Sequence, residues 1–283
     1  MRALAQFAMT GRRQAILAAL ILGCLPLVNF LSPPVVALVG LRHGKSEALL
    51  VMVWAAIPAI GWALLGDVMP LLTLLGITVL ALVLRGTGSW EITLLASIGV
   101  GIGARIGLTL QPEILNLLEA QLTQVMEQVA NSPELQGQVS LVEPAQLHRL
   151  MITTFAFVVT FMTVSLLMWA RSWQARLYNP GGFREEFHHL RLSWKSGAGL
   201  FLLFLLANVS PPVFQQLALF FVLPLVIAGA ALVHGLVGRR KLPVAVLVIF
   251  YSVLVYPVMT QLLVLAALAD SWIDFRSKVP SRE

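Results

Sequence analysis

The sequence predicts an all-α protein, a polytopic membrane helical bundle with about eight to ten spans, some of them broken by proline. Three observations lead to this prediction. Hydrophobic residues make up 58% of the 283 residues and charged residues only 11%, whereas soluble domains hold about 45–50% and about 25%. The mean hydropathy is +0.87. Apolar runs alternate with short basic loops. We therefore expect residues 1–283 to form a single integral membrane domain.

The positive charges indicate how the chain faces the membrane. The net charge is +6, which in a soluble protein would suggest nucleic acid. Here the basic residues gather in short loops at 42–45, 171–195 and 239–241, and the positive-inside rule places such loops in the cytoplasm. A basic track with interleaved stacking aromatics is absent from the sequence, so we expect no nucleic-acid partner.

The first half of the chain alternates between crossings and tight turns. Residues 14–31 form the first expected span, which Pro33 and Pro34 end because proline cannot continue a helix. Residues 35–41 are too short to cross alone, so a short, tilted or re-entrant helix covered by protein is expected there. Further spans are expected at 46–66, 68–85 and 90–110.

Residues 111–149 have a different character. Glutamates are frequent, and Arg149 is the only lysine or arginine. Apolar residues recur at spacings of three and four, which predicts an amphipathic helix that Pro133 ends. We expect an external insert that lies on the membrane or caps the bundle, with a short coiled-coil contact as the alternative.

The second half is expected to cross at 150–170, 196–210 and 213–238. The last apolar block, 243–269, is interrupted by Pro257. A single crossing would place the C-terminal tail outside, and a hairpin broken at Pro257 would place it inside.

The cytoplasmic basic connector at 171–195 interleaves cations with aromatic residues, and residues 179–182, Asn-Pro-Gly-Gly, predict a reversal between two short surface helices. Basic side chains favour anionic headgroups, and aromatic rings favour the membrane interface. The connector is therefore either a solvated loop or a docking surface for a cytoplasmic partner or a phosphorylated headgroup. The residues assigned to that surface are Arg171, Trp173, Arg176, Tyr178, Arg184 and Arg191.

Polar residues within the apolar blocks predict a ligand-binding site near the outer face. Arg105 is costly at membrane depth, so it either snorkels outward or faces the bundle and pairs with Asp67. The breaks at 32–34 and 210–212 lie at the same level and free backbone groups there. The residues assigned to the site are Arg105, Asp67, Asn29, Asn208, Gln215 and Gln216. The alternative is interhelical hydrogen bonding, at about 0.6 kcal/mol per pair.

Gly99, Gly103 and Gly107 recur every four residues and predict a smooth face for close helix packing. Catalytic motifs such as G-x-S-x-G, H-E-x-x-H and the Walker A sequence are absent from the sequence. The single cysteine, Cys24, allows no cysteine metal cluster. We therefore expect no enzyme activity, no cofactor and no metal site.

Three segments together resemble the YybS-like family of integral membrane proteins, whose function is unassigned. They are 177–187 (LYNPGGFREEF), 42–44 (RHG) and 270–276 (DSWIDFR). That family is distantly similar to the substrate-binding subunits of energy-coupling-factor transporters. The resemblance implies an outward-facing pocket and a partner ATPase with its coupling protein, and Ala15 and Ala19 match the spacing of the coupling helix. The insert at 111–149 departs from that pattern.

These observations lead to a functional hypothesis. We expect a multi-pass, transport-related protein of a bacterial inner (cytoplasmic) membrane, as a substrate-binding subunit for a small molecule. The alternative is a non-transporting membrane scaffold or lipid-interacting protein that acts through its cytoplasmic loop. The expected partners are membrane lipids and a cytoplasmic or transporter protein.

Overall fold

The computed structural model describes residues 2–110, 112–130 and 143–279, and these residues form helices and no strand. The first group comprises α1 (Arg2–Met9), α2 (Arg12–Cys24), the 3-10 turn η1 (Asn29–Leu31), α3 (Ser32–His43), α4 (Lys45–Leu64), α5 (Met69–Thr87) and α6 (Trp90–Thr109). The second comprises α7 (Pro112–Ala130), α8 (Pro144–Tyr178), α9 (Gly182–His189), α10 (Trp194–Val209), α11 (Pro212–Gln215), α12 (Ala218–Arg239), α13 (Ala245–Val253), α14 (Pro257–Ile273) and α15 (Phe275–Lys278).

Five of the described helices, α4, α5, α6, α8 and α12, are long and apolar enough to cross a membrane. Two further pairs pass the same test together but are bent, α9 with α10 by 63° and α13 with α14 by 113°. The described residues thus hold five spans, or seven if each bent pair is one span, so the predicted number is wrong. Proline breaks explain the difference, because α2 and α3 have only 13 and 12 residues. Such helices extend about 20 Å, less than the hydrocarbon core of about 30 Å.

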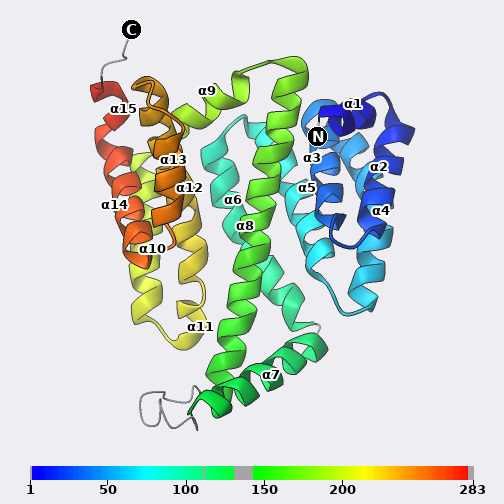
Figure 1. The fold of residues 1–283 in the computed structure, drawn as a ribbon, viewed down its shortest axis with the longest axis vertical. Helices are drawn as coiled ribbons and strands as arrows, with labels where there is room; N and C mark the ends of the chain where they lie inside the picture. Colours follow the sequence, from blue (N-terminus) through cyan, green and yellow to red (C-terminus); the bar gives the residue numbers. More distant parts are fainter. Residues whose placement is uncertain (1, 111, 131–142, 280–283) are drawn as a thin grey trace.

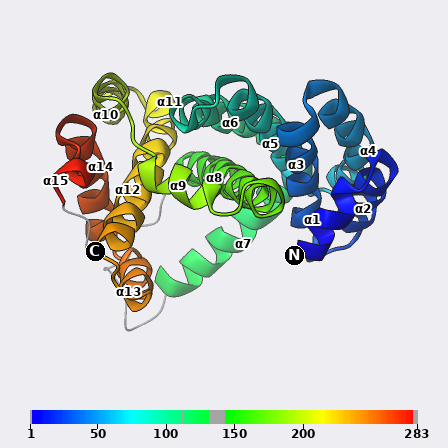
Figure 2. The ribbon, with the colours of Figure 1, turned by 90° about the horizontal axis from the view of Figure 1, so that it is seen from above.

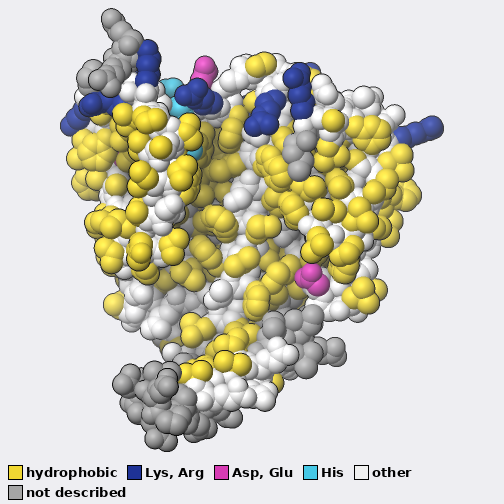
Figure 3. Space-filling model, in the orientation of Figure 1, with side chains coloured by type: hydrophobic (Ala, Val, Ile, Leu, Met, Phe, Trp, Pro, Cys, Tyr) yellow, Lys and Arg dark blue, Asp and Glu magenta, His cyan; other side chains and the backbone are white. Residues whose placement is uncertain are grey.

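Helix α8 lies at the centre of the molecule, with α1–α5 on one side and α10–α15 on the other (Figures 1 and 2). Helices α1, α9 and α15 lie at one end, and α7 lies at the other (Figure 1). Lysine and arginine side chains gather along the first of these ends, and hydrophobic side chains cover the flank (Figure 3). We call it the basic end. The arrangement is that of a multi-pass membrane protein.

Helix α3 is short, and it is covered on every side. Residues 32–41 are all buried, and the covering helices are α2, α4, α5 and α8. Pro33 and Pro34 occupy its first turn. Backbone N–H groups in a first turn have no acceptor within the helix, so proline, which lacks an N–H, is tolerated there. The predicted short helix covered by protein is therefore present, and the prolines begin it.

The polar backbone groups at the ends of this short hairpin have side-chain partners. Arg85 Nη1 donates to the carbonyl oxygen of Leu41 at 2.6 Å, and Gln174 Nε2 donates to the same oxygen at 3.2 Å. At the far end of α2, Trp62 Nε1 donates to the carbonyl of Gly23 at 2.8 Å. Because lipid offers no hydrogen bonds, these donors satisfy carbonyls that a short helix leaves open.

Helices α13 and α14 are bent by 113° at the break before Pro257, and α15 lies at the basic end (Figure 1), as the hairpin alternative predicts. Arg276, which is 6% exposed, forms an ion pair with Asp270 and donates through Nη2 to the carbonyl of Leu190 at 2.9 Å. This buried contact ties the tail to the segment that follows α9.

Helix α7 occupies most of the described part of the predicted external insert (Figure 1). It packs on the first turns of α8, where His148 Nδ1 lies 2.8 Å from Glu119 Oε2. Residues 111 and 131–142, which include the predicted stop at Pro133, lie outside the described residues.

Substituting alanine for Gly229 should destabilise the contact between α12 and α14. A Cβ there would lie 2.7 Å from Leu263 Cγ and 2.9 Å from the Leu263 carbonyl oxygen, so the helices must separate. We expect a loss of about 1–3 kcal/mol, as for other overpacked cores. Gly103→Ala is the matched control, because nothing lies within 4 Å of its added Cβ. Thermal unfolding in detergent measures both, and equal midpoints would contradict the packing at Gly229.

The hairpin at Pro257 predicts which face of the membrane the tail reaches. In a Cys24→Ser background, Ser277→Cys should react with an impermeant thiol reagent from the same side as Arg240→Cys. Gln124→Cys, on exposed α7, should react from the opposite side. All three positions are exposed. Labelling of Ser277→Cys together with Gln124→Cys would exclude the hairpin.

Candidate functional site

The structure brings together two of the six residues predicted to form an outer ligand site. Arg105 on α6 donates through Nη2 to Oε1 of Gln216, which follows α11 and is 9% exposed. Arg105 Nε is buried and has no hydrogen-bond partner. The arginine therefore faces the bundle. This was one of the two alternatives drawn from the sequence, the other being that it snorkels outward.

The other four predicted residues have local roles. Asp67 Oδ1 accepts from the backbone N–H of Met69 at 3.1 Å, in the first turn of α5. Within the described residues it forms no ion pair with Arg105, contrary to the predicted pairing. Asn208 donates to the carbonyl of Phe204 at 2.7 Å, and Gln215 donates to that of Ser210 at 3.0 Å. Asn29 lines a separate cavity of about 10 Å³ beside α3. Among the contacts of the described residues, the Arg105–Gln216 hydrogen bond is the one that joins two members of this set.

Four of the six residues predicted to form a headgroup surface are engaged elsewhere. Arg171 forms an ion pair with Glu186, and Arg191 forms one with Asp274 at 3.0 Å. The Tyr178 ring lies under the Arg42 guanidinium, 4.1 Å from its carbon. Trp173 is 1% exposed, so its assignment to the surface is wrong. The physical reason is that α8 continues unbroken to Tyr178, which turns Trp173 into the core.

The predicted glycine face makes close contacts at one position. A Cβ on Gly107 would lie 2.5 Å from Leu72, but nothing lies within 4 Å of one on Gly99 or Gly103. Gly101, which the four-residue spacing leaves out, lies against Phe220 and Thr160. The close face of α6 is therefore offset from the predicted one.

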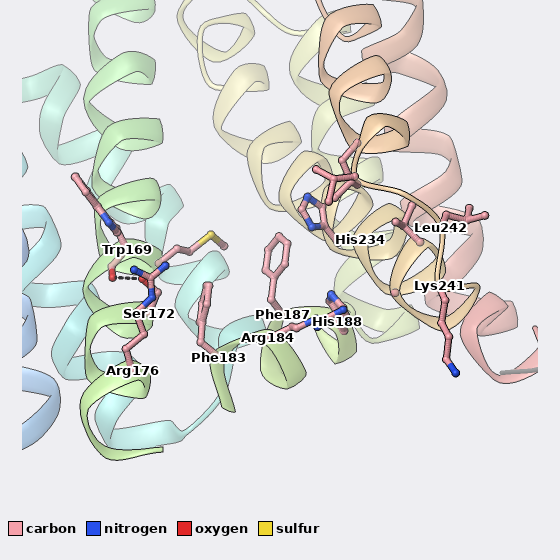
Figure 4. A pocket seen from close by; sticks show the side chains of 15 residues that line it. Trp169, Ser172, Arg176, Phe183, Arg184, Phe187, His188, His234, Lys241 and Leu242 are labelled. Carbon is pink, nitrogen blue, oxygen red and sulfur yellow. Dashed lines mark hydrogen bonds between the residues drawn. The ribbon is translucent and has the colours of Figure 1, made fainter. Parts of the chain in front are cut away.

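A cavity of about 800 Å³ opens at the basic end between α8, α9 and α12 and the start of α13. Its wall is mainly apolar and aromatic, as the close-up in Figure 4 shows. The apolar lining residues are Met168, Trp169, Phe183, Phe187, Val237, Leu242, Val244 and Leu247. Ligand cavities commonly have volumes of about 300–1,000 Å³ and walls of this kind.

Three cations from three different elements complete this lining. Arg176 ends α8, Arg184 lies on α9, and Lys241 follows α12. Each is exposed, and none forms an ion pair within the described residues. No aspartate or glutamate is among the residues that line the cavity. The cavity therefore combines an apolar body with an uncompensated positive rim.

One lining residue, His234, forms a polar pair with a tyrosine outside the lining. His234 projects from α12 into the cavity (Figure 4), and its Nε2 lies 2.8 Å from the Tyr251 hydroxyl on α13. Phe187 packs edge-on to the His234 ring, with centroids 5.2 Å apart and planes at 75°. Phe183 stacks on Phe187 at 6.0 Å. This aromatic series connects α9, α12 and α13.

Close backbone approach holds α9 against α12. A Cβ at Gly235 would lie 2.8 Å from the His188 carbonyl oxygen, and one at Gly238 would lie 2.5 Å from the His188 ring. Two glycines one turn apart therefore let the end of α9 reach α12 and close the cavity on that side.

The sequence-based assignment missed His234, Lys241 and the Phe183–Phe187 pair as site residues. A histidine inside the apolar run 213–238 was the available signal, because ionisable residues within spans mark functional sites by default. The convergence of α8, α9 and α12 depends on long-range packing, which the local pattern does not show.

The Arg105–Gln216 hydrogen bond should give a measurable coupling energy in a double-mutant cycle of unfolding stability. Gln216→Ala would leave a second guanidinium nitrogen without its partner, so we expect about 1.5–3 kcal/mol of destabilisation. The double variant with Arg105→Ala should cost less than the sum of the two single variants. Thermal unfolding of the four proteins gives the coupling energy, and strictly additive losses would show that the contact contributes nothing.

The described residues hold no group of three or more histidine, cysteine, aspartate or glutamate side chains that could bind a metal ion. The resemblance to the YybS-like family stays a prediction. Comparison of the chain with protein-family models, curated proteins and solved structures finds no match to any of them.

Proposed function

We propose that this protein binds an anionic, lipid-like amphiphile in the cavity at its basic end. The observation that carries the proposal is the combination of an 800 Å³ apolar cavity with three unpaired cations at its rim. Arg176, Arg184 and Lys241 suit an anionic headgroup, and the wall of Trp169 and Phe187 suits its apolar portion. The protein is thus a lipid-interacting membrane protein, which was the alternative drawn from the sequence.

Charge sorting supports an anionic rather than a neutral ligand. Some arginines near the basic end have carboxylate partners, such as Arg171 with Glu186 and Arg276 with Asp270. Those pairs hold helices together. The rim cations have no such partner among the described residues, and they gain most from a negative group brought by a ligand.

The position of the cavity supports a ligand from the bilayer. By the positive-inside rule, the basic end faces the cytoplasm of a bacterial inner membrane. Helix α13, beside the cavity, has no buried residue, so most of its side chains face outward at membrane depth. A hydrophobic surface of this kind belongs next to acyl chains. An amphiphile of the cytoplasmic leaflet would already lie at the height of the rim.

A transport-related role is the second candidate, and Arg105 is the observation that favours it. Its buried Nε without an acceptor marks a position near the opposite end where an anionic substrate would be stabilised. Mass spectrometry of small molecules that co-purify after mild extraction tests this role. Loss of a co-purifying molecule in Arg105→Ala, with retention in Gly103→Ala, would support it.

Neutralising the rim should weaken binding of an anionic amphiphile. At about 1 kcal/mol per basic residue, the triple variant Arg176→Gln, Arg184→Gln, Lys241→Gln should bind about 100-fold more weakly. Native mass spectrometry or titration in nanodiscs with phosphatidylglycerol measures this affinity. The matched control neutralises Arg13, Lys195 and Arg240, which are exposed and do not line the cavity. An equal loss in both triple variants would refute a specific site.

A further inference from the structure

His234 lies further from the basic end, along α12, than the rim cation Lys241. His234 precedes the end of α12 at Arg239 by five residues, which places it about 7.5 Å further along the helix axis. Lys241, on the rim, lies beyond that end. A ligand whose headgroup meets the rim therefore presents a more deeply placed part of its structure to His234.

The His234 ring has one nitrogen in use and one free. Its Nε2 faces the Tyr251 hydroxyl at 2.8 Å. In the part of the chain that the structure describes, Nδ1 has no hydrogen-bond partner. A neutral imidazole always has one donor and one acceptor nitrogen, so a single partner leaves one of these capacities open. An open polar group at this depth calls for a partner, because lipid supplies none.

The geometry fixes the ring in place. Phe187 meets the imidazole edge-on, with centroids 5.2 Å apart, and Tyr251 holds Nε2 from the facing helix. The 2.8 Å contact fits either tautomer of the ring, and a phenol is a stronger acid than a neutral imidazole, so we take the phenol as the donor to Nε2. In that tautomer Nδ1 carries the ring proton and can donate it to a ligand in the cavity.

We infer that His234 recognises an ester carbonyl of a glycerophospholipid whose phosphate lies at the Arg176–Arg184–Lys241 rim. In such a lipid the ester groups follow the phosphate by a few bonds on the acyl side, which is the order in which the rim and His234 occur along the cavity. This inference rests on the proposed function. It narrows the ligand from anionic amphiphiles in general to those that carry a carbonyl acceptor below an anionic headgroup.

The test compares two lipids on the full-length protein in nanodiscs of zwitterionic diether lipid. The probes are phosphatidylglycerol with ester-linked chains and its diether analogue, matched in headgroup and chain length. The diether lacks the carbonyl acceptor, so the wild-type protein should bind the diester about fivefold more tightly, the effect of one hydrogen bond. His234→Phe should abolish this preference and leave the diether affinity unchanged. His234→Gln, which keeps an N–H donor, should retain part of it.

The outcomes separate this inference from the proposed function. Equal affinity of the wild-type protein for both lipids would overturn the role of His234 and leave the headgroup site intact. A preference that survives in His234→Phe would also overturn it. Absence of saturable binding of either lipid would overturn both proposals. The wild-type comparison needs no variant, so it decides the question even if a substitution prevents folding.

Discussion

The constraint on which this structure depends is that a helix too short to cross a membrane must be shielded from lipid. Helix α3, at 12 residues, is such a helix, and residues 32–41 are buried throughout. Its covering requires α2, α4, α5 and α8 around it, and its last carbonyls require Arg85 and Gln174 as donors. The placement of α8 beside α3 then determines where the second half of the chain can pack, because α6, α9 and α12 all contact α8.

The same constraint explains how the charges divide into two classes. A cation in or near the membrane is stable when a carboxylate or carbonyl neutralises it, and Arg276 with Asp270 is the most buried example. Arg171 and Arg191 are used in the same structural way. Cations left unpaired at the mouth of an apolar cavity are available for a ligand. The sequence shows Arg171, Arg176, Arg184 and Arg191 as one basic connector, whereas the fold divides them between structural and ligand-facing roles.

Sequence reasoning was most successful where one local property decides the outcome. The continuous apolar runs at 46–66, 68–85 and 90–110 correspond to α4, α5 and α6, and the prolines at 33–34 mark a break that is present. It failed where long-range packing decides. Trp173 looks like an interfacial aromatic, but α8 carries it into the core. An inward-facing Arg105 was one of two alternatives, and its partner proved to be Gln216 rather than Asp67. Arg105 and Gln216 are 111 residues apart in the sequence, and local sequence patterns do not indicate contacts between such distant residues.

The length of α8 has one more consequence. Its 35 residues extend about 52 Å, well beyond the hydrocarbon core of about 30 Å at both ends. One continuous helix therefore carries both His148 and Arg176. His148 contacts α7 at one face of the membrane, and Arg176 lies at the mouth of the cavity at the other. A rod that tilts about its middle moves its two ends in opposite directions. A tilt of α8 would therefore change the orientation of α7 on one side of the bilayer and the width of the cavity on the other together.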